Sequence, residues 1–199
     1  MKGRTLLKFK IELEYVEPEV WRRILIPGDA TFFDLHYAIQ NSMGWENCHL
    51  HMFTFKKTRT RPKLDIGLPS DYDQETEPGW ELHVADFFKR RGSKVVYEYD
   101  FGDSWTHLVT YEGTEEAVEG RRYPQCLEGK RACPPEDCGG VGGYLNLLDV
   151  IKDPTHEEYE ERLEWLGDDF DPEAFEPQNV VFHSPKKALE WMLNSQDSL

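Results

Sequence analysis

The sequence lacks any hydrophobic run long enough to cross a membrane. A membrane-spanning helix needs about 20 consecutive apolar residues, and no segment of the chain approaches that length. The opening stretch "MKGRTLLKFKIELEY" alternates charged with apolar residues, whereas a secretory signal peptide carries an unbroken apolar stretch before a small-residue cleavage site. We therefore expect a cytoplasmic protein with no membrane partner.

Basic residues are scarce. The 199 residues include 23 Lys and Arg against 38 Asp and Glu, a formal net charge of -15. A surface of this kind repels phosphate backbones, so nucleic-acid binding by the whole surface is not expected. Residues 152–177 alone carry eleven acidic and two basic residues. A protein partner, and specifically a basic one, fits this segment better.

Paired Cys-x-x-Cys motifs are absent, although the chain has four cysteines. In a reducing cytoplasm we expect thiols or metal ligands rather than disulfides. Cys126, Cys133 and Cys138 share one irregular segment, where three soft ligands can bind zinc, with His156, His107 or His51 as the fourth ligand. The missing paired motif leaves open the alternative that these are small thiols buried among prolines.

Cys48 and His51 form a Cys-x-x-His spacing on a predicted strand. Side chains alternate along a strand, so these two face opposite sides and can ligate one ion only across a bulge.

The apolar pattern predicts an α+β fold. Hydrophobic residues make up 39% of the chain, enough for a core. Alternation over Leu7–Tyr15 and the stretch "VWRRILIP" predict two strands that form a hairpin, and "HLHMFTF" predicts a third strand. Between them, Thr31 and Asp34 are suited to cap a helix that ends at Gly44. Its apolar face comprises Phe32, Leu35, Ile39 and Met43.

The remainder contains a long region without periodicity and three predicted helices. Lys56–Gly79 shows no repeat and is interpreted as a loop. The helices are expected over Tyr144–Lys152, after a cap at Asp153 or Thr155, and after Ser184. The strand and helix order favours a β-grasp-like mixed sheet packed on one main helix, with a helical C-terminal extension. We expect one domain over 1–199, with a core in 1–115 and the irregular segment and helices in 116–199.

The stretch "YEYDFGDSWTHLVTYEG" contains Asp-Phe-Gly, which holds magnesium in protein kinases. No Gly-rich loop or His-Arg-Asp motif precedes it, so the kinase reading fails on context. A three-residue turn over Gly102–Ser104 predicts a hairpin. In this register Phe101 faces Trp105, Tyr99 faces His107, Tyr97 faces Val109 and Val95 faces Tyr111.

Two interpretations of this hairpin stay open. Asp100, Asp103 and His107 can form a metal or acid–base site, although strand alternation sets Asp100 and His107 on opposite faces. Alternatively, the two aspartates bind turn amides and His107 binds a core partner such as a tyrosine hydroxyl.

The stretch "PPEDCGGVGGY" is rich in glycine and precedes a predicted helix, as phosphate loops do. It has no lysine, and Glu136 and Asp137 repel phosphate, so it matches neither phosphate fingerprint. The two carboxylates can instead serve as acid–base groups or as solvated surface charges.

Three long blocks resemble one known family. They are "YEYDFGDSWTHLVTYEG", "YPQCLEGKRACPPEDCGGVGGY" and "DPTHEEYEERLEWLGDDFDPEAF", with "FFDLHYAIQNSMGW" also similar. Together they resemble the plasmid pRiA4b open-reading-frame-three-like family. The resemblance implies an α+β domain, often found on plasmids or beside mobile elements, and it transfers no established catalytic residue.

The leading functional hypothesis is a non-enzymatic interaction module associated with plasmid or mobile-element biology. Its expected surface joins the hairpin tip, Asp103, Ser104 and Trp105, to Glu136 and Asp137. The alternative is a metal-dependent enzyme, such as a hydrolase, using Cys126, Cys133, Cys138 and His156 or the region of Asp100 and His107.

Overall fold

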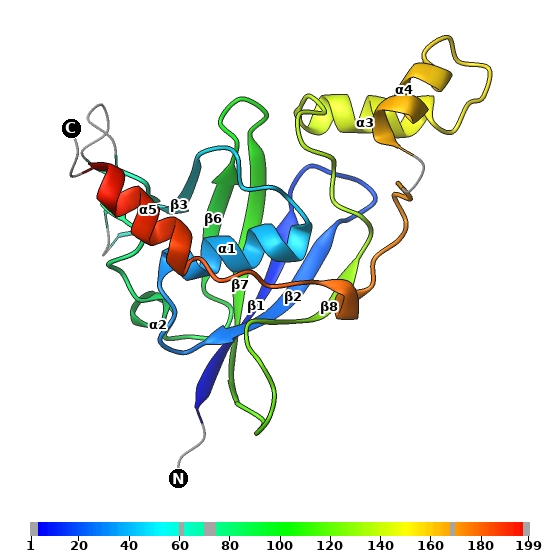
Figure 1. The fold of residues 1–199 in the computed structure, drawn as a ribbon. Coiled ribbons are helices and arrows are strands. Elements are labelled where there is room, and N and C mark those ends of the chain that lie inside the picture. Colours follow the sequence, from blue (N-terminus) through cyan, green and yellow to red (C-terminus); the bar gives the residue numbers. More distant parts are fainter. Residues whose placement is uncertain (1–3, 60–61, 70–74, 168–169, 197–199) are drawn as a thin grey trace.

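The computed structural model describes residues 4–59, 62–69, 75–167 and 170–196. One large twisted sheet forms the body, helix α1 lies across one of its faces, and helices α3 and α4 project from one corner (Figure 1). The strands are β1 (Thr5–Leu13), β2 (Trp21–Pro27), β3 (His51–Phe55), β4 (Leu64–Gly67), β5 (Glu77–Pro78), β6 (Lys94–Tyr99), β7 (Trp105–Glu116) and β8 (Gln125–Lys130). The helices are α1 (Phe32–Met43), α2 (Val84–Phe87), α3 (Gly140–Val150), α4 (Tyr159–Leu166) and α5 (Lys186–Gln196), with a short 3₁₀ turn at Pro177–Asn179.

The eight strands form one sheet in the order β5-β4-β3-β6-β7-β1-β2-β8. Neighbouring strands are antiparallel except β4 and β5, which are parallel. The α+β class is therefore confirmed. A β-grasp likeness and a single main helix are not confirmed, because the described residues contain an eight-stranded sheet and five α-helices.

Strand β1 shows the predicted alternation as far as Leu13, where it ends, whereas Tyr15, predicted on the buried face, is 74% exposed with a φ of 67°. Leu7, Phe9, Ile11 and Leu13 are buried, while the charged residues between them lie on the other face. On that other face Arg23 of β2 bonds to Glu112 of β7 and Glu128 of β8. One face of the sheet thus packs against α1, and the other carries ion pairs.

Helix α1 begins and ends where the sequence predicts. The Thr31 hydroxyl accepts from the Asp34 amide, and the Asp34 carboxylate accepts from the Thr31 amide, which makes a capping box. Gly44 ends the helix in the left-handed region, with φ of 99°. The predicted apolar face of α1 is fully buried.

The prediction of a plain loop over Lys56–Gly79 is wrong in part. Strand β4 pairs with β3 over Met52–Phe55, and β5 extends the sheet edge beside β4. Short edge strands carry too few residues to show a period of two. Residues 60–61 and 70–74 of this stretch lie outside the described residues.

The predicted hairpin exists, but its register is wrong. Tyr99 pairs with Trp105, Tyr97 with His107 and Val95 with Val109, so the connection spans residues 100–104. The reason lies in Asp100, whose φ of 56° takes the chain out of the strand before Phe101. The aromatic face itself was correctly predicted, except that Phe101 is 45% exposed.

The interior contains a histidine cluster, which consists of His36, His51 and His107 around Tyr97. The rings of His36 and His51 stack with centroids 3.5 Å apart. The Tyr97 hydroxyl lies 2.8 Å from His36 Nδ1 and accepts from the Gln40 amide at 2.9 Å. Burial lowers the pKa of His36 to about 3 and that of His107 to about 4.

The C-terminal helices occur, with shifted bounds. Helix α3 starts four residues before Tyr144, and α4 starts at Tyr159 because Asp153 caps an isolated turn, accepting from the Thr155 amide and hydroxyl. Residues 170–185 run as an extended segment, with one short 3₁₀ turn, across the front of α1 to the start of α5 (Figure 1). Within the described residues, no helix is both long and apolar enough to cross a membrane.

Candidate metal centre

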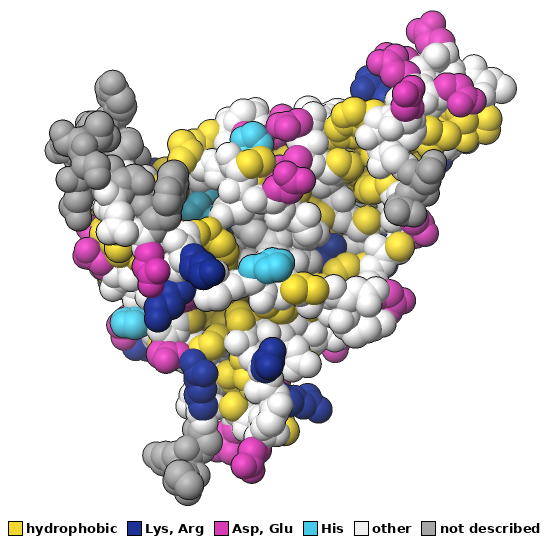
Figure 2. Space-filling view, in the orientation of Figure 1, with side chains coloured by type: hydrophobic (Ala, Val, Ile, Leu, Met, Phe, Trp, Pro, Cys, Tyr) yellow, Lys and Arg dark blue, Asp and Glu magenta, His cyan; other side chains and the backbone are white. Residues whose placement is uncertain are grey.

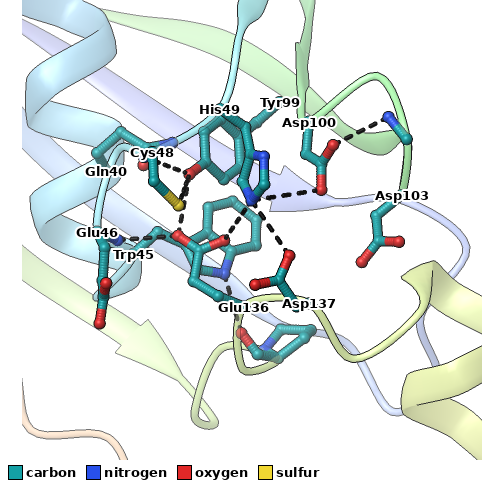
Figure 3. A network of polar contacts seen from close by, with 12 residues as sticks. Gln40, Trp45, Glu46, Cys48, His49, Tyr99, Asp100, Asp103, Glu136 and Asp137 are labelled. Carbon is teal, nitrogen blue, oxygen red and sulfur yellow. Dashed lines mark hydrogen bonds and ion pairs between the residues drawn. The ribbon is translucent and has the colours of Figure 1, made fainter.

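Three segments that are distant in the sequence meet at one end of the sheet (Figure 3). They are the segment between α1 and β3, the β6–β7 turn, and the loop before α3. Trp45 holds them together: its ring stacks on Tyr99 with centroids 4.9 Å apart, and its indole N–H donates to the Pro134 carbonyl at 2.9 Å. The predicted hairpin and cysteine-bearing loop therefore do converge.

Asp100 is held at the start of the turn by backbone bonds. Its Oδ1 accepts from the Gly102 amide at 2.9 Å, and its carbonyl accepts from Ser104. Its own amide donates to the Leu50 carbonyl at 2.9 Å, which links the turn to the chain entering β3. These bonds leave Oδ2 free to face the neighbouring segment.

Glu136 is held in the same way. Its Oε1 accepts from the Tyr99 hydroxyl and from the Glu46 amide, both at 2.9 Å. Its Oε2 is buried and, among the described residues, has no hydrogen-bond partner. Burial, followed by the hydrogen bond to Glu136, raises the pKa of Tyr99, so the hydroxyl remains a donor.

His49 lies between these carboxylates. Its Nε2 is 3.8 Å from Asp100 Oδ2, 3.9 Å from Glu136 Oε2 and 3.3 Å from Asp137 Oδ1. The nitrogen is buried and has no hydrogen-bond partner in the described parts of the chain. In Figure 3 the three carboxylates point at this one nitrogen from two different segments.

Cys48 adds a softer ligand to one side. Its Sγ lies 3.8 Å from the Tyr99 hydroxyl, and its amide donates to that hydroxyl at 3.1 Å. Two groups of potential ligand atoms result, within 4.8 Å of one another in each group. They are Cys48, His49 and Glu136, and His49, Asp100 and Asp137.

The spacing fits a divalent cation. Ligand atoms about 2.1 Å from a tetrahedral zinc ion are about 3.4 Å apart, and the contacts of His49 Nε2 run from 3.3 to 3.9 Å. Imidazole with carboxylates is a ligand set that zinc and manganese use. The carboxylates of Asp100 and Glu136 are oriented by amides or a hydroxyl, as metal ligands are in known sites.

Asp103 lies beside this centre and anchors α3. Its Oδ2 accepts from the Gly139 amide at 3.2 Å, just before the helix. Gly140 packs so closely that an added Cβ would lie 2.7 Å from the Asp103 carbonyl oxygen. The Gly-rich stretch therefore serves a close backbone approach and a carboxylate, consistent with its failure to match a phosphate loop.

Only part of the predicted hairpin tip, Asp103 to Trp105, lies on the surface. Trp105 is fully buried and packs against Trp45, with centroids 6.0 Å apart. The prediction that Trp105 forms part of a surface is wrong, because Trp105 pairs with Tyr99 inside the sheet. Asp103 and Ser104 remain on the turn, next to Glu136 and Asp137.

The four ligands predicted for zinc, Cys126, Cys133, Cys138 and His156, do not form one ligand group among the described residues. All four cysteines are free thiols. Cys126 donates to the Glu128 carbonyl inside the sheet, while His156 is exposed before α4 and accepts from the Glu158 amide. Burial raises the pKa of Cys126 to about 11 and that of Cys138 to about 12. Within the described residues, the ligand groups contain none of Cys126, Cys133, Cys138 and His156.

Asp100 and His107 also lie apart, as alternation predicts. His107 is fully buried and its Nδ1 donates to the Trp105 carbonyl at 3.1 Å. The histidine that Asp100 faces is His49, which the sequence did not single out. Its signal was the pairing of β3 with β6, which sets the residues just before His51 beside those just after Tyr99.

The fold and the centre define an α+β protein with a histidine–carboxylate cluster at the end of its sheet. The chain belongs to the family described as plasmid pRiA4b ORF-3-like protein, whose model matches residues 5–179. The resemblance seen in the sequence is thereby confirmed.

Relatives of known sequence and structure agree with this membership. The chain is 36% identical over 176 residues to the uncharacterized protein y4hQ of Sinorhizobium fredii (strain NBRC 101917 / NGR234), covering 85% of this chain and 86% of that protein. It is also similar to a crystal structure of a protein of unknown function, MM3350 from Methanosarcina mazei Go1, with 42% identity and a TM-score of 0.83. That match covers 91% of this chain and 100% of the other.

Proposed function

We propose that this chain is a metal-binding domain whose centre is His49, with Asp100 and Asp137 as one ligand group and Cys48 and Glu136 as the other. The observation that carries the proposal is an arrangement shared by two carboxylates, those of Asp100 and Glu136. In Asp100 and in Glu136 one oxygen accepts hydrogen bonds from the protein, and the other is directed at His49 Nε2. A buried nitrogen that has no hydrogen bond and lies 3.3 to 3.9 Å from three carboxylate oxygens favours a cation between them.

The chemistry of this set suits a divalent transition metal of the zinc or manganese class. A bound zinc ion supplies Lewis acidity and lowers the pKa of a coordinated water to about 7. The protein groups hold the ligands: Tyr99 and the Glu46 amide orient Glu136, and the Gly102 amide orients Asp100. A metal-dependent hydrolase, the alternative raised by the sequence, thus has a better location here than at the cysteines.

Metal titration tests the proposal. Protein purified without added metal is analysed for its elemental content, then titrated with Zn²⁺ and Mn²⁺ by calorimetry. We expect one ion per chain and at least a hundredfold loss of affinity in His49→Ala. His156→Gln is the matched control, because His156 is exposed and far along the chain from the centre. An unchanged affinity in His49→Ala, or no binding at all, would overturn the proposal.

The interaction module, with its link to plasmid or mobile-element biology, is the second candidate. It is supported by α4, which has no buried residue and carries Leu163 and Trp165 exposed at 38% and 48%. Figure 2 displays acidic and hydrophobic side chains together on the projecting arm. Charge complementarity makes a basic protein the partner that this arm fits.

A peptide titration tests this second candidate. A lysine-rich helical peptide with an apolar face is expected to bind the chain more weakly as salt rises, and its glutamate counterpart is expected not to bind. Replacing Glu160, Glu161 and Glu164 together by lysine should abolish binding of the first peptide. Equal binding of both peptides would exclude the charge-based partner.

A further inference from the structure

A small cavity adjoins the metal centre on the side of the α3–α4 arm. Its volume is ≈ 160 Å³, and its lining includes Asp137, Asn146, Arg162 and Trp165. Asp137 belongs to both places: its Oδ1 faces His49 Nε2, and its side chain forms part of the cavity wall. A ligand in this cavity would therefore lie next to an ion held by His49.

Arg162 gives the cavity an unused donor. Its Nη2 lies 3.3 Å from Glu158 Oε2, one turn earlier on the helix. Its Nε is buried and has no hydrogen-bond partner among the residues described. A guanidinium presents its N–H groups in a planar fork that matches the two oxygens of a carboxylate or phosphate.

The charge of the wall makes occupancy depend on the metal. Without a cation, the carboxylate of Asp137 repels an anion from the cavity. A divalent ion at His49 offsets two of the negative charges of the centre, exceeds the charge of Asp137 alone, and becomes the largest local charge at the site. Arg162 on one side and the ion on the other would then hold one anionic group between them.

We propose that the metal-loaded centre binds a small oxyanion, a phosphate or carboxylate group, in the cavity between Asp137 and Arg162. This inference rests on the proposed metal site and adds the class of its ligand. Trp165 connects this cavity to a second one. Its side chain also lines a neighbouring hollow of ≈ 340 Å³, together with Met43, Trp45 and Phe170. An apolar group attached to the oxyanion would be accommodated there.

The test measures binding of inorganic phosphate and, in a separate arm, of acetate to the whole chain by calorimetry. Each anion is titrated into metal-free protein and into protein loaded with one equivalent of Zn²⁺. We expect binding to the loaded form to be at least tenfold tighter than to the metal-free form for at least one anion. The arm with the tighter binding identifies the phosphate or the carboxylate class.

Two variants that each remove one positive charge distinguish binding in the cavity from a general effect of the protein's charge. Arg162→Gln should weaken anion binding at least tenfold and leave zinc affinity unchanged. Lys152→Gln, an exposed cation of the same acidic segment, should change neither. If zinc binds but neither anion does, or if both variants behave alike, the oxyanion site is refuted and the metal site stands. If zinc does not bind, both proposals fall.

Discussion

Two histidines on either side of Leu50 lie in opposite environments. His51 is 4% exposed and stacks on His36 in the core, and burial lowers its pKa well below the usual range. His49 lies at the end of the sheet, where its Nε2 faces three carboxylates. Strand β6, which pairs with β3, shows the same contrast. Tyr97 forms hydrogen bonds with His36 and Gln40 in the core, while Tyr99 donates to Glu136 at the end of the sheet.

The contrast shows that place along a strand, as well as face, decides a side chain's role. A period of two puts His49 and His51 on the same side of the chain, and likewise Tyr97 and Tyr99. Within the sheet, His51 and Tyr97 are surrounded by aromatic rings. Their rings therefore pack in the core, and the Tyr97 hydroxyl forms its hydrogen bonds inside the protein. At the sheet end the neighbours are loops that bring charge, so the same residue types can bind a ligand.

Truncating one histidine in each region should give the largest difference. His36→Ala removes a stacked ring and a hydrogen bond to Tyr97, so we expect it to lower the free energy of unfolding by roughly 3 kcal/mol. His49→Ala, measured without metal, should lower it by less than about 1 kcal/mol. Urea unfolding followed by circular dichroism measures both, and similar losses in the two variants would contradict the division.

Acid should destabilise the fold through the interior histidines. The pKa of His107 is about 4 when folded, against about 6.5 in an unfolded chain, so between these values the unfolded state binds the extra proton. Stability is therefore complete above pH 6.5 and falls as pH drops toward 4. At pH 5 the loss from one such histidine is about 2 kcal/mol.

Unfolding free energies at pH 7.5 and pH 5 measure this loss. His107→Gln keeps a hydrogen-bonding side chain that does not titrate, so the difference between the two pH values should shrink by about 2 kcal/mol. A variant with the same pH difference as the parent chain would show that His107 is not the group responsible.

The two tyrosines should separate stability from metal affinity. Tyr97→Phe leaves Gln40 without its hydroxyl partner in the core, so we expect a loss of about 1.5 kcal/mol in the free energy of unfolding. Tyr99→Phe removes the hydroxyl that orients Glu136, so we expect about tenfold weaker Zn²⁺ binding. Calorimetry measures the Zn²⁺ affinity of both variants, and urea unfolding measures their free energies of unfolding. Equal changes of both quantities in the two variants would contradict the comparison.

Two glycines in the first turn of α3 should give the smallest effects. Gly140→Ala places a Cβ 2.7 Å from the Asp103 carbonyl at a φ of 67°, so we expect a loss of roughly 1 kcal/mol or more. Gly142→Ala has open space around its Cβ, so this matched variant should be neutral or slightly stabilising. Thermal unfolding distinguishes them, and equal midpoints would mean that the contact with Asp103 does not constrain the turn.

Strands β1, β2 and β3 and helix α1 were predictable because their signals are local, whereas β4, β5 and β8 lie in stretches that were predicted to be irregular. Alternation in β1 and the Thr31–Asp34 cap depend on residues within one element, and both occur as predicted. The hairpin register was not predictable in the same way. It depends on the left-handed φ of Asp100, a backbone choice that the residue type permits but does not require.

The candidate site was predictable in part. Glu136 and Asp137 stood out as acids in a Gly-rich stretch, and Asp100 as a turn residue, but His49 did not. His49 meets the carboxylates through contacts between segments that are distant in the sequence. The pairing of β3 with β6 brings Asp100 to it, and the bond between Trp45 and Pro134 holds the loop of Glu136 and Asp137 nearby. Cys126, Cys133 and Cys138 attracted attention by residue type. Cys126 is buried, and Cys133 and Cys138 pack partly buried against the core, which agrees with the alternative of small buried thiols.

The central position of β1 has a consequence for how the chain is made. This strand leaves the ribosome before one of its two neighbours, β7, which is synthesised roughly a hundred residues later. The sheet is therefore incomplete until β8 has emerged as far as Lys130, and Glu136 and Asp137 follow after that. Ion capture at the proposed centre would thus be a late event that reports a correctly completed sheet.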